Sequence, residues 1–216
     1  VADYADAPGG VLLANPNAPT AIALPPSDIR RLLQTNPHRA VVVDEAYADF
    51  CDCSAVELLD EFPNLLVVRT FSKSHSLAGM RLGYALGQPE MIQALDAVKN
   101  CFNSYPIDRV AQAVGEAAMR ADAYYARTAR DICATRDWTT AQLRARGFVL
   151  ADSAANFVFA RHPHQDAALL MAQLRQHKIL VRHFAAPRVR EYLRITIGLP
   201  QQMQALMDAL DDIVGA

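Results

Sequence analysis

Cysteine, lysine and long apolar runs are all scarce in this chain of 216 residues. The four cysteines include no Cys-x-x-Cys motif, and their number is low for a disulfide framework, so we expect free thiols in a reducing compartment, the cytoplasm. No apolar run has membrane-spanning length and no signal-peptide pattern is present, so we expect no membrane association. Because the net charge is −2 and the six histidines lack metal-ligand spacing, we expect neither a nucleic-acid partner nor a metal site.

Lysine is the scarcest basic residue, and Lys73 is the lysine best placed for chemistry. It follows the apolar run at 65–68, which is typical of a buried parallel strand. Unlike arginine, lysine can lose its proton and attack a carbonyl carbon. An isolated Ser-Lys-Ser is more often a solvated loop, so the choice between the two interpretations depends on the surrounding motifs.

The apolar runs predict an α/β fold. Short continuous runs at 11–14, 40–43, 65–68 and 82–86, with a helix opening near Pro25, predict a mostly parallel, helix-flanked sheet. A helix follows at 89–100, and four of its apolar residues are expected to point inward: Met91, Ile92, Leu95 and Val98.

The second part of the chain has a different pattern. From Pro106 it is helical by composition, and we expect either a break near residues 120–122 or a long connecting helix. Beyond Gly147, short apolar runs at 148–150, 157–160, 179–182 and 192–197 and helices at 165–177 and 201–214 predict a small α+β domain. We therefore expect two domains, residues 1–120 and residues 121–216.

Polar residues follow three of the expected parallel strands, where ligands bind in open α/β sheets. A lysine, a carboxylate, a phenol and an amide together suit a pyridoxal phosphate site, because the amine can bind the aldehyde and the carboxylate can keep the ring nitrogen protonated. Serine and arginine can hold the phosphate, the arginine in a bidentate manner. The candidate residues are Asn17, Asp44, Tyr47, Ser72, Lys73 and Arg81.

Three motifs carry a family resemblance: Asn-Pro-Asn-Ala-Pro-Thr at 15–20, Val-Asp-Glu-Ala-Tyr-Ala-Asp-Phe at 43–50, and Arg-Thr-Phe-Ser-Lys-Ser-His-Ser-Leu-Ala-Gly-Met-Arg-Leu-Gly-Tyr at 69–84. With Ser-Ala-Ala-Asn-Phe at 153–157 and Glu-Tyr-Leu-Arg-Ile-Thr-Ile-Gly at 191–198, the chain resembles fold-type I, class I/II aminotransferases. Within these it is most similar to the histidinol-phosphate aminotransferase family, from about residue 10 to its end.

The resemblance implies a role for each candidate residue. Lys73 would hold pyridoxal 5'-phosphate covalently, and Asp44 and Tyr47 would contact the ring nitrogen and the ring oxygen. Ser72 and Arg81 would bind the phosphate. On the substrate side, it implies Arg194 at the anionic group, with Asn156 and Tyr105 lining the site.

The loop after the first expected strand departs from the family pattern at Ala18, where relatives carry the amide that usually contacts the cofactor. Many relatives read Asn-Asn-Pro-Thr-Gly where this chain reads Asn17-Ala18-Pro19-Thr20-Ala21, so Asn17 must supply the amide if any residue does.

The resemblance also implies a reaction, its partners and an assembly. Histidinol phosphate and 2-oxoglutarate would be converted to imidazole acetol phosphate and glutamate by a homodimer. The alternatives are another class I/II aminotransferase, such as one for aromatic amino acids, an amino-acid-phosphate decarboxylase, or a non-catalytic cofactor-binding module. Family members have a further N-terminal segment, so we expect this chain to be the later part of the large domain plus the small domain, and inactive alone.

Overall fold

The computed structural model describes residues 1–215 and divides the chain into two compact units. The first unit contains Val1–Pro16 and Ala23–Ala126, and the second contains Asn17–Ile22 and the chain from Arg127 onward. Among residues 1–215, no helix combines the length and the apolar character needed to cross a bilayer.

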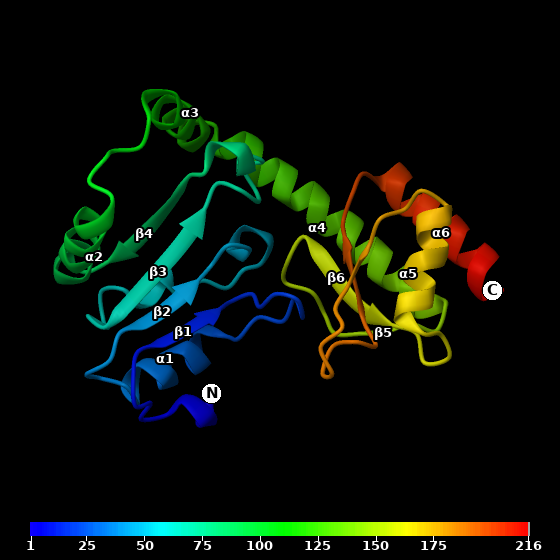
Figure 1. Cartoon of the computed structure of the whole chain (residues 1–216), viewed down its shortest axis with the longest axis horizontal. Coiled ribbons are helices and arrows are strands. Elements are labelled where there is room, and N and C mark those ends of the chain that lie inside the picture. The colour runs from blue at the N-terminus through cyan, green and yellow to red at the C-terminus, as the bar shows by residue number, and fades with distance from the viewer. Residues whose placement is uncertain (216) are drawn as a thin grey trace. The chain divides into compact units, whose positions relative to one another are not determined.

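A four-stranded sheet forms the centre of the first unit. Its strands are β1 (Val11–Ala14), β2 (Val41–Asp44), β3 (Leu65–Thr70) and β4 (Gly83–Gly87), and they lie side by side in chain order (Figure 1). β1, β2 and β3 are mutually parallel, whereas β4 is antiparallel to β3. The predicted α/β class with a mostly parallel sheet is therefore confirmed.

The helices of the first unit are α1 (Pro26–Gln34), α2 (Pro89–Phe102) and α3 (Arg109–Arg120), with 3-10 turns η1 (Ala2–Tyr4), η2 (Ala48–Phe50), η3 (Ala55–Leu58) and η4 (Ala78–Met80). Prolines open α1 and α2, where a missing backbone N–H costs no helical hydrogen bond. Ile29, Leu32 and Leu33 of α1 share a core with the valines of the sheet. α3 ends at Arg120 and α4 (Asp122–Ala145) begins two residues later, so the expected break in the long helical segment is confirmed.

α2 differs from the sequence prediction. None of its residues is buried, and Leu95 and Val98 are 42% and 62% exposed. The prediction that this face points inward is therefore wrong for the described residues. An amphipathic pattern identifies the apolar face of a helix, but it does not supply the surface that covers it.

The second unit contains a smaller antiparallel sheet in the order β5-β6-β8-β7. Its elements are β5 (Val149–Leu150), β6 (Phe157–Arg161), α5 (Ala167–Gln176), β7 (Arg182–His183), β8 (Leu193–Thr196) and α6 (Pro200–Val214). The strand expected at 179–182 is wrong for residues 179–181, because β7 contains only Arg182 and His183, the two residues that pair with β8.

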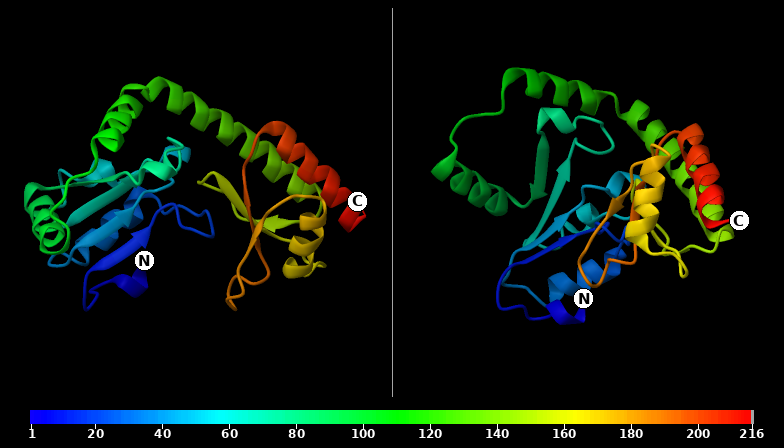
Figure 2. Two further views of the ribbon diagram at one scale, coloured as in Figure 1. Left: turned by 45° about the horizontal axis from the view of Figure 1, so that its top comes forward. Right: turned by 45° about the vertical axis from the view of Figure 1, so that its right-hand side comes forward.

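One core fills this unit. It joins the buried residues of β6 and β8 to Leu143 of α4, Leu174 of α5 and Leu206 of α6. Figure 2 shows these three helices on one side of the sheet. The predicted small α+β arrangement is what the structure contains.

Candidate functional site

The carboxyl ends of β2 and β3 form the edge at which the first candidate residues lie. The two strands are parallel and in register, with Asp44 opposite Val68, so the loops that follow them leave the sheet at the same edge. The Nζ atom of Lys73 lies 5.4 Å from the centre of the Tyr47 ring. Lys73 is exposed, and Asp44 is half-buried with its Oδ1 accepting a hydrogen bond of 3.0 Å from the Ala46 N–H. The structure thus brings the predicted lysine, phenol and carboxylate to one edge.

The loop after β3 carries the two expected phosphate ligands. The Ser72 N–H donates to Thr70 Oγ1 at 3.1 Å, and the Ser72 side chain is half-buried. Arg81 is exposed, and its Nη1 donates to the Ala78 carbonyl at 2.9 Å. Its backbone is left-handed, with φ of 54°, a conformation that costs free energy in a residue other than glycine. Such strained residues cluster at ligand sites.

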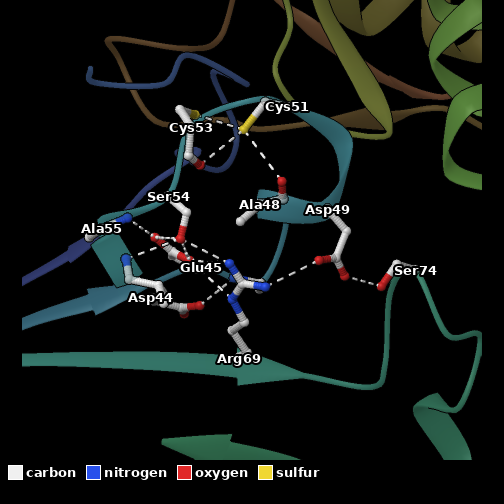
Figure 3. Close-up of polar contacts among 12 residues, drawn as sticks. Asp44, Glu45, Ala48, Asp49, Cys51, Cys53, Ser54, Ala55, Arg69 and Ser74 are labelled. Atoms are coloured by element: carbon white, nitrogen blue, oxygen red, sulfur yellow. Dashed lines mark hydrogen bonds and ion pairs between the residues drawn. The ribbon is translucent and has the colours of Figure 1, made fainter. Parts of the chain in front are cut away.

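A buried ion pair beside this edge was missed by the sequence reasoning. The Glu45 side chain has no exposed surface and accepts hydrogen bonds from Arg69 Nε at 3.1 Å and Nη2 at 2.8 Å (Figure 3). It also accepts from the Ser54 hydroxyl at 2.9 Å and from the Ala55 N–H at 2.5 Å. The carboxylate is therefore fully engaged, as a buried charge must be.

Arg69 extends this network to the loop after β3. Its Nη1 lies 3.4 Å from Asp49 Oδ1, and the other Asp49 oxygen accepts a hydrogen bond from buried Ser74, next to Lys73. Burial opposes the charge of Arg69, but the hydrogen bond and the charge of Glu45 outweigh it and raise the pKa of the guanidinium. Oppositely charged residues at the ends of adjacent buried strands were the available signal for this pair.

In the turn-rich loop after β1, the side-chain amides of Asn15 and Asn17 form hydrogen bonds with residues nearby in the chain. Asn15 is buried, and its side chain donates to the Leu24 carbonyl at 3.1 Å and accepts from the Leu24 N–H at 2.7 Å. Asn17, in the second unit, donates its side-chain N–H to Thr20 Oγ1 at 2.7 Å. Ala21 takes a left-handed φ of 62°, which glycine adopts at lower cost.

The second unit holds the substrate-side candidates Arg194 and Asn156. Arg194 lies on β8, with its guanidinium carbon 5.1 Å from the centre of the Phe157 ring and 5.8 Å from that of Phe184. Its Nε is buried and has no hydrogen-bond partner among residues 1–215. Asn156 accepts a hydrogen bond through its backbone carbonyl from the Ile197 N–H at 2.9 Å.

Tyr105, the remaining candidate, belongs to the first unit. It lies between α2 and α3 and is 81% exposed.

Comparison with known proteins identifies the family to which the chain is similar. The family model for aminotransferase class I and II matches residues 2–210. A histidinol-phosphate aminotransferase of Aromatoleum aromaticum is 53% identical over 208 residues, which are 96% of this chain and 58% of that protein. Curated relatives of this kind are longer than the chain, which spans between 58% and 61% of their length.

Solved structures agree with the sequence matches. The histidinol-phosphate aminotransferase of Sinorhizobium meliloti, solved in complex with pyridoxal-5'-phosphate, superposes with a TM-score of 0.83 at 28% identity, covering 95% of this chain and 57% of that one. An L-threonine-O-3-phosphate decarboxylase of Porphyromonas gingivalis superposes with a TM-score of 0.80 at 25% identity, covering 96% and 65%. Because the family model matches almost the whole chain, this protein belongs to the class I and II aminotransferases.

Proposed function

We propose that this chain is the lysine-bearing part of a pyridoxal-phosphate-dependent aminotransferase that acts on histidinol phosphate and 2-oxoglutarate. The observation that carries the proposal is the placement of Lys73, Tyr47 and Asp44 at one edge of the parallel sheet, in a chain 53% identical to a histidinol-phosphate aminotransferase. Because the chain spans only part of that relative, the activity is proposed for the complete enzyme.

The side chains at this edge fit the cofactor. When bound, pyridoxal phosphate supplies an aldehyde that amines attack and a protonated ring that withdraws electrons. Lys73 is exposed and offers an amine, and Asp44 offers a carboxylate for the ring nitrogen. Ser72 and Arg81 offer a hydroxyl and a guanidinium to a phosphate, and the left-handed backbone of Arg81 is the kind of strain found at ligand sites.

Besides binding the cofactor, Lys73 is proposed to transfer a proton during the reaction. A lysine amine that is released by the substrate amine can take a proton at one carbon and return it at another. The Asp44 carboxylate would pair with the ring nitrogen of the cofactor and so favour the protonated ring. Tyr47 lies beside Lys73, and its hydroxyl is proposed to donate a hydrogen bond to the ring oxygen of the cofactor.

Substrate recognition is assigned to the second unit. Arg194 carries a buried Nε without a partner among residues 1–215, and an unsatisfied cationic donor is best matched by an anionic group. We propose that Arg194 binds the phosphate or the carboxylate of the two substrates, with Asn156 and Tyr105 lining the site and Asn17 supplying the amide near the cofactor. On this proposal, residues 1–120 belong to the cofactor-binding domain and residues 121–216 form the small domain.

The proposal also includes a homodimer in the cytoplasm. None of the four cysteines forms a disulfide among residues 1–215, which favours a reducing compartment. Val98, Phe102 and Tyr105 are 62%, 80% and 81% exposed, and exposed apolar side chains of this size favour a further interface. Light scattering on the purified chain measures the assembly: the mass of a dimer would support the proposal, and the mass of a monomer would count against dimerisation through this chain alone.

The cofactor assignment is tested by trapping. The purified chain is mixed with pyridoxal phosphate, reduced with borohydride, digested with trypsin and mapped by mass spectrometry. We expect the label in the peptide of residues 70–81, uncleaved at Lys73, and its loss in Lys73→Ala. Lys99→Ala is the matched control, since Lys99 lies on α2, which follows the end of the antiparallel strand β4 at the opposite edge of the sheet. Equal labelling of Lys99 and Lys73 would contradict the assignment.

The activity is tested in a chimera that joins this chain to the part of the Aromatoleum relative that the chain does not cover. We expect glutamate to form from histidinol phosphate and 2-oxoglutarate, and Asp44→Ala to abolish turnover because the ring loses its electrostatic partner. Retained turnover in Asp44→Ala would refute the proposed pairing.

A second candidate function is decarboxylation of an amino acid phosphate. It is favoured by the similarity to the L-threonine-O-3-phosphate decarboxylase, at a TM-score of 0.80. The same chimera distinguishes the two reactions, because a decarboxylase releases carbon dioxide without 2-oxoglutarate, whereas a transaminase requires the oxoacid.

A further inference from the structure

Two cysteines of the loop between η2 and η3 lie in direct contact. The Sγ atoms of Cys51 and Cys53 are 2.7 Å apart (Figure 3). Both residues are half-buried and both thiols are free. Cys101 and Cys133 lie on α2 and α4, so the structure separates the four cysteines into one close pair and two others.

The surroundings distinguish the two sulfur atoms of the pair. Cys51 Sγ contacts the Ala48 carbonyl at 3.6 Å and the Cys53 carbonyl at 3.5 Å. Burial, followed by the contact with the Cys53 thiol, raises the pKa of Cys51 to about 12, and the charge of Glu45 adds to the effect. Cys51 therefore stays protonated at neutral pH and is a poor first nucleophile, because thiolates rather than thiols attack oxidants.

We propose that Cys51 and Cys53 form an oxidation site, at which a hydroperoxide converts the two thiols to an intrachain disulfide. Cys53 Sγ attacks the peroxide, the O–O bond breaks, and a sulfenic acid forms at Cys53 with release of an alcohol or water. Cys51 Sγ then attacks Cys53 Sγ, the S–O bond breaks, and the leaving hydroxide takes the Cys51 proton as water. Two thiols are oxidised and one hydroperoxide is reduced, so atoms and electrons balance.

The cysteine pair lies next to residues of the candidate site in the chain. Cys51 directly follows η2, which begins after Tyr47 and contains Asp49. Cys53 directly precedes Ser54, whose hydroxyl donates to buried Glu45. Disulfide closure requires the two sulfur atoms to approach to ~2.05 Å, so the backbone on both sides must adjust. Oxidation of this thiol pair would therefore shift the backbone next to the loop that carries Tyr47.

The test uses the whole chain, first reduced and then treated with hydrogen peroxide at a near-stoichiometric amount. Trypsin releases residues 40–69 as one peptide that contains Cys51 and Cys53 but neither Cys101 nor Cys133. We expect this peptide to lose the mass of two hydrogen atoms and to resist alkylation until a reductant is added. We also expect the number of thiols, titrated with a thiol reagent in the unfolded chain, to fall from four before oxidation to two after it.

The controls separate the pair from the other cysteines. A Cys101→Ser, Cys133→Ser variant keeps the pair, and it should form the same disulfide at the same rate. In Cys51→Ser, a dimedone adduct should accumulate at Cys53, since the second thiol is missing. Cys53→Ser should react more slowly, because Cys51 is held protonated.

Three results would overturn the proposal. They are an unmodified peptide 40–69 while Cys101 oxidises, a sulfinic acid in that peptide without the loss of two hydrogens, and a disulfide that links two chains. The wild-type measurement decides the question even if a cysteine variant fails to fold.

Discussion

Replacing Arg69 with leucine tests whether a buried charge pair joins the two loops of the candidate site. Glu45 has no exposed surface, whereas the Arg69 side chain is 22% exposed. Leucine in place of Arg69 leaves the carboxylate with Ser54 and Ala55 as donors but without a cation. Glu45→Gln makes the complementary change, because it removes the charge and turns one acceptor into a donor.

The magnitude follows from the burial of the pair. Removing one partner of a buried ion pair costs roughly 3–5 kcal/mol, because the remaining charge stays desolvated. Partial exposure of Arg69 lets water reach the site, so we expect the lower end, about 3 kcal/mol. For a chain of this size, that corresponds to a decrease in melting temperature of roughly 6–12 °C.

The assay is thermal and urea unfolding followed by circular dichroism, with Arg144→Leu as the matched control. Arg144 pairs with Asp152 at 2.7 Å, but these side chains are 50% and 92% exposed, so its loss should cost at most about 1 kcal/mol. The double variant Glu45→Leu, Arg69→Leu should recover part of the loss, since both charges are gone while the Ala55 N–H loses its acceptor. If Arg69→Leu costs no more than the control, the buried-charge reasoning is refuted.

Two further predictions concern the second unit. Arg146 binds Asp211 at 2.6 and 2.7 Å, and this hydrogen bond lowers the pKa of Asp211, so its stabilisation is present at neutral pH and is lost as the pH falls through the lowered value. Asp211→Asn should therefore lower the urea midpoint at pH 7, and the gap to wild type should close on acidification; a gap independent of pH would contradict this. Leu143 is fully buried, so Leu143→Ala should cost about 2–5 kcal/mol in urea unfolding. Leu180→Ala, at a side chain 77% exposed, should change little, and equal losses would contradict the assigned core.

Local sequence patterns were sufficient for most of the elements. The continuous run at 11–14 became β1 with the same bounds, and Pro89 opens α2 as expected. Periodicity is a local property, since it depends on which face of a strand or helix is apolar. The short strand β7 is the exception, because only two residues there find a pairing partner on β8.

The candidate site was predictable for a different reason. Residues that follow parallel strands meet at one edge, so the order of the strands alone is enough to group Asp44, Tyr47 and Lys73. Their proposed roles, and those of Arg194 and Asn17, stay predictions. The motifs carry them by similarity, and the proposed trapping and chimera experiments test Lys73 and Asp44 directly.

By itself, the sequence determined the order of strands and helices, the parallel centre of the first sheet and the residues at its carboxyl edge. Only the tertiary structure decided that Glu45 would meet Arg69, 24 residues away, and that α2 would keep its apolar face exposed. The contact between the Cys51 and Cys53 thiols was likewise decided by the loop that folds around Glu45. The reason is physical: periodicity acts within an element, whereas charge pairing and burial depend on which distant surfaces the folded chain brings together, and the thiol contact depends on the backbone conformation of an irregular loop, which has no periodicity.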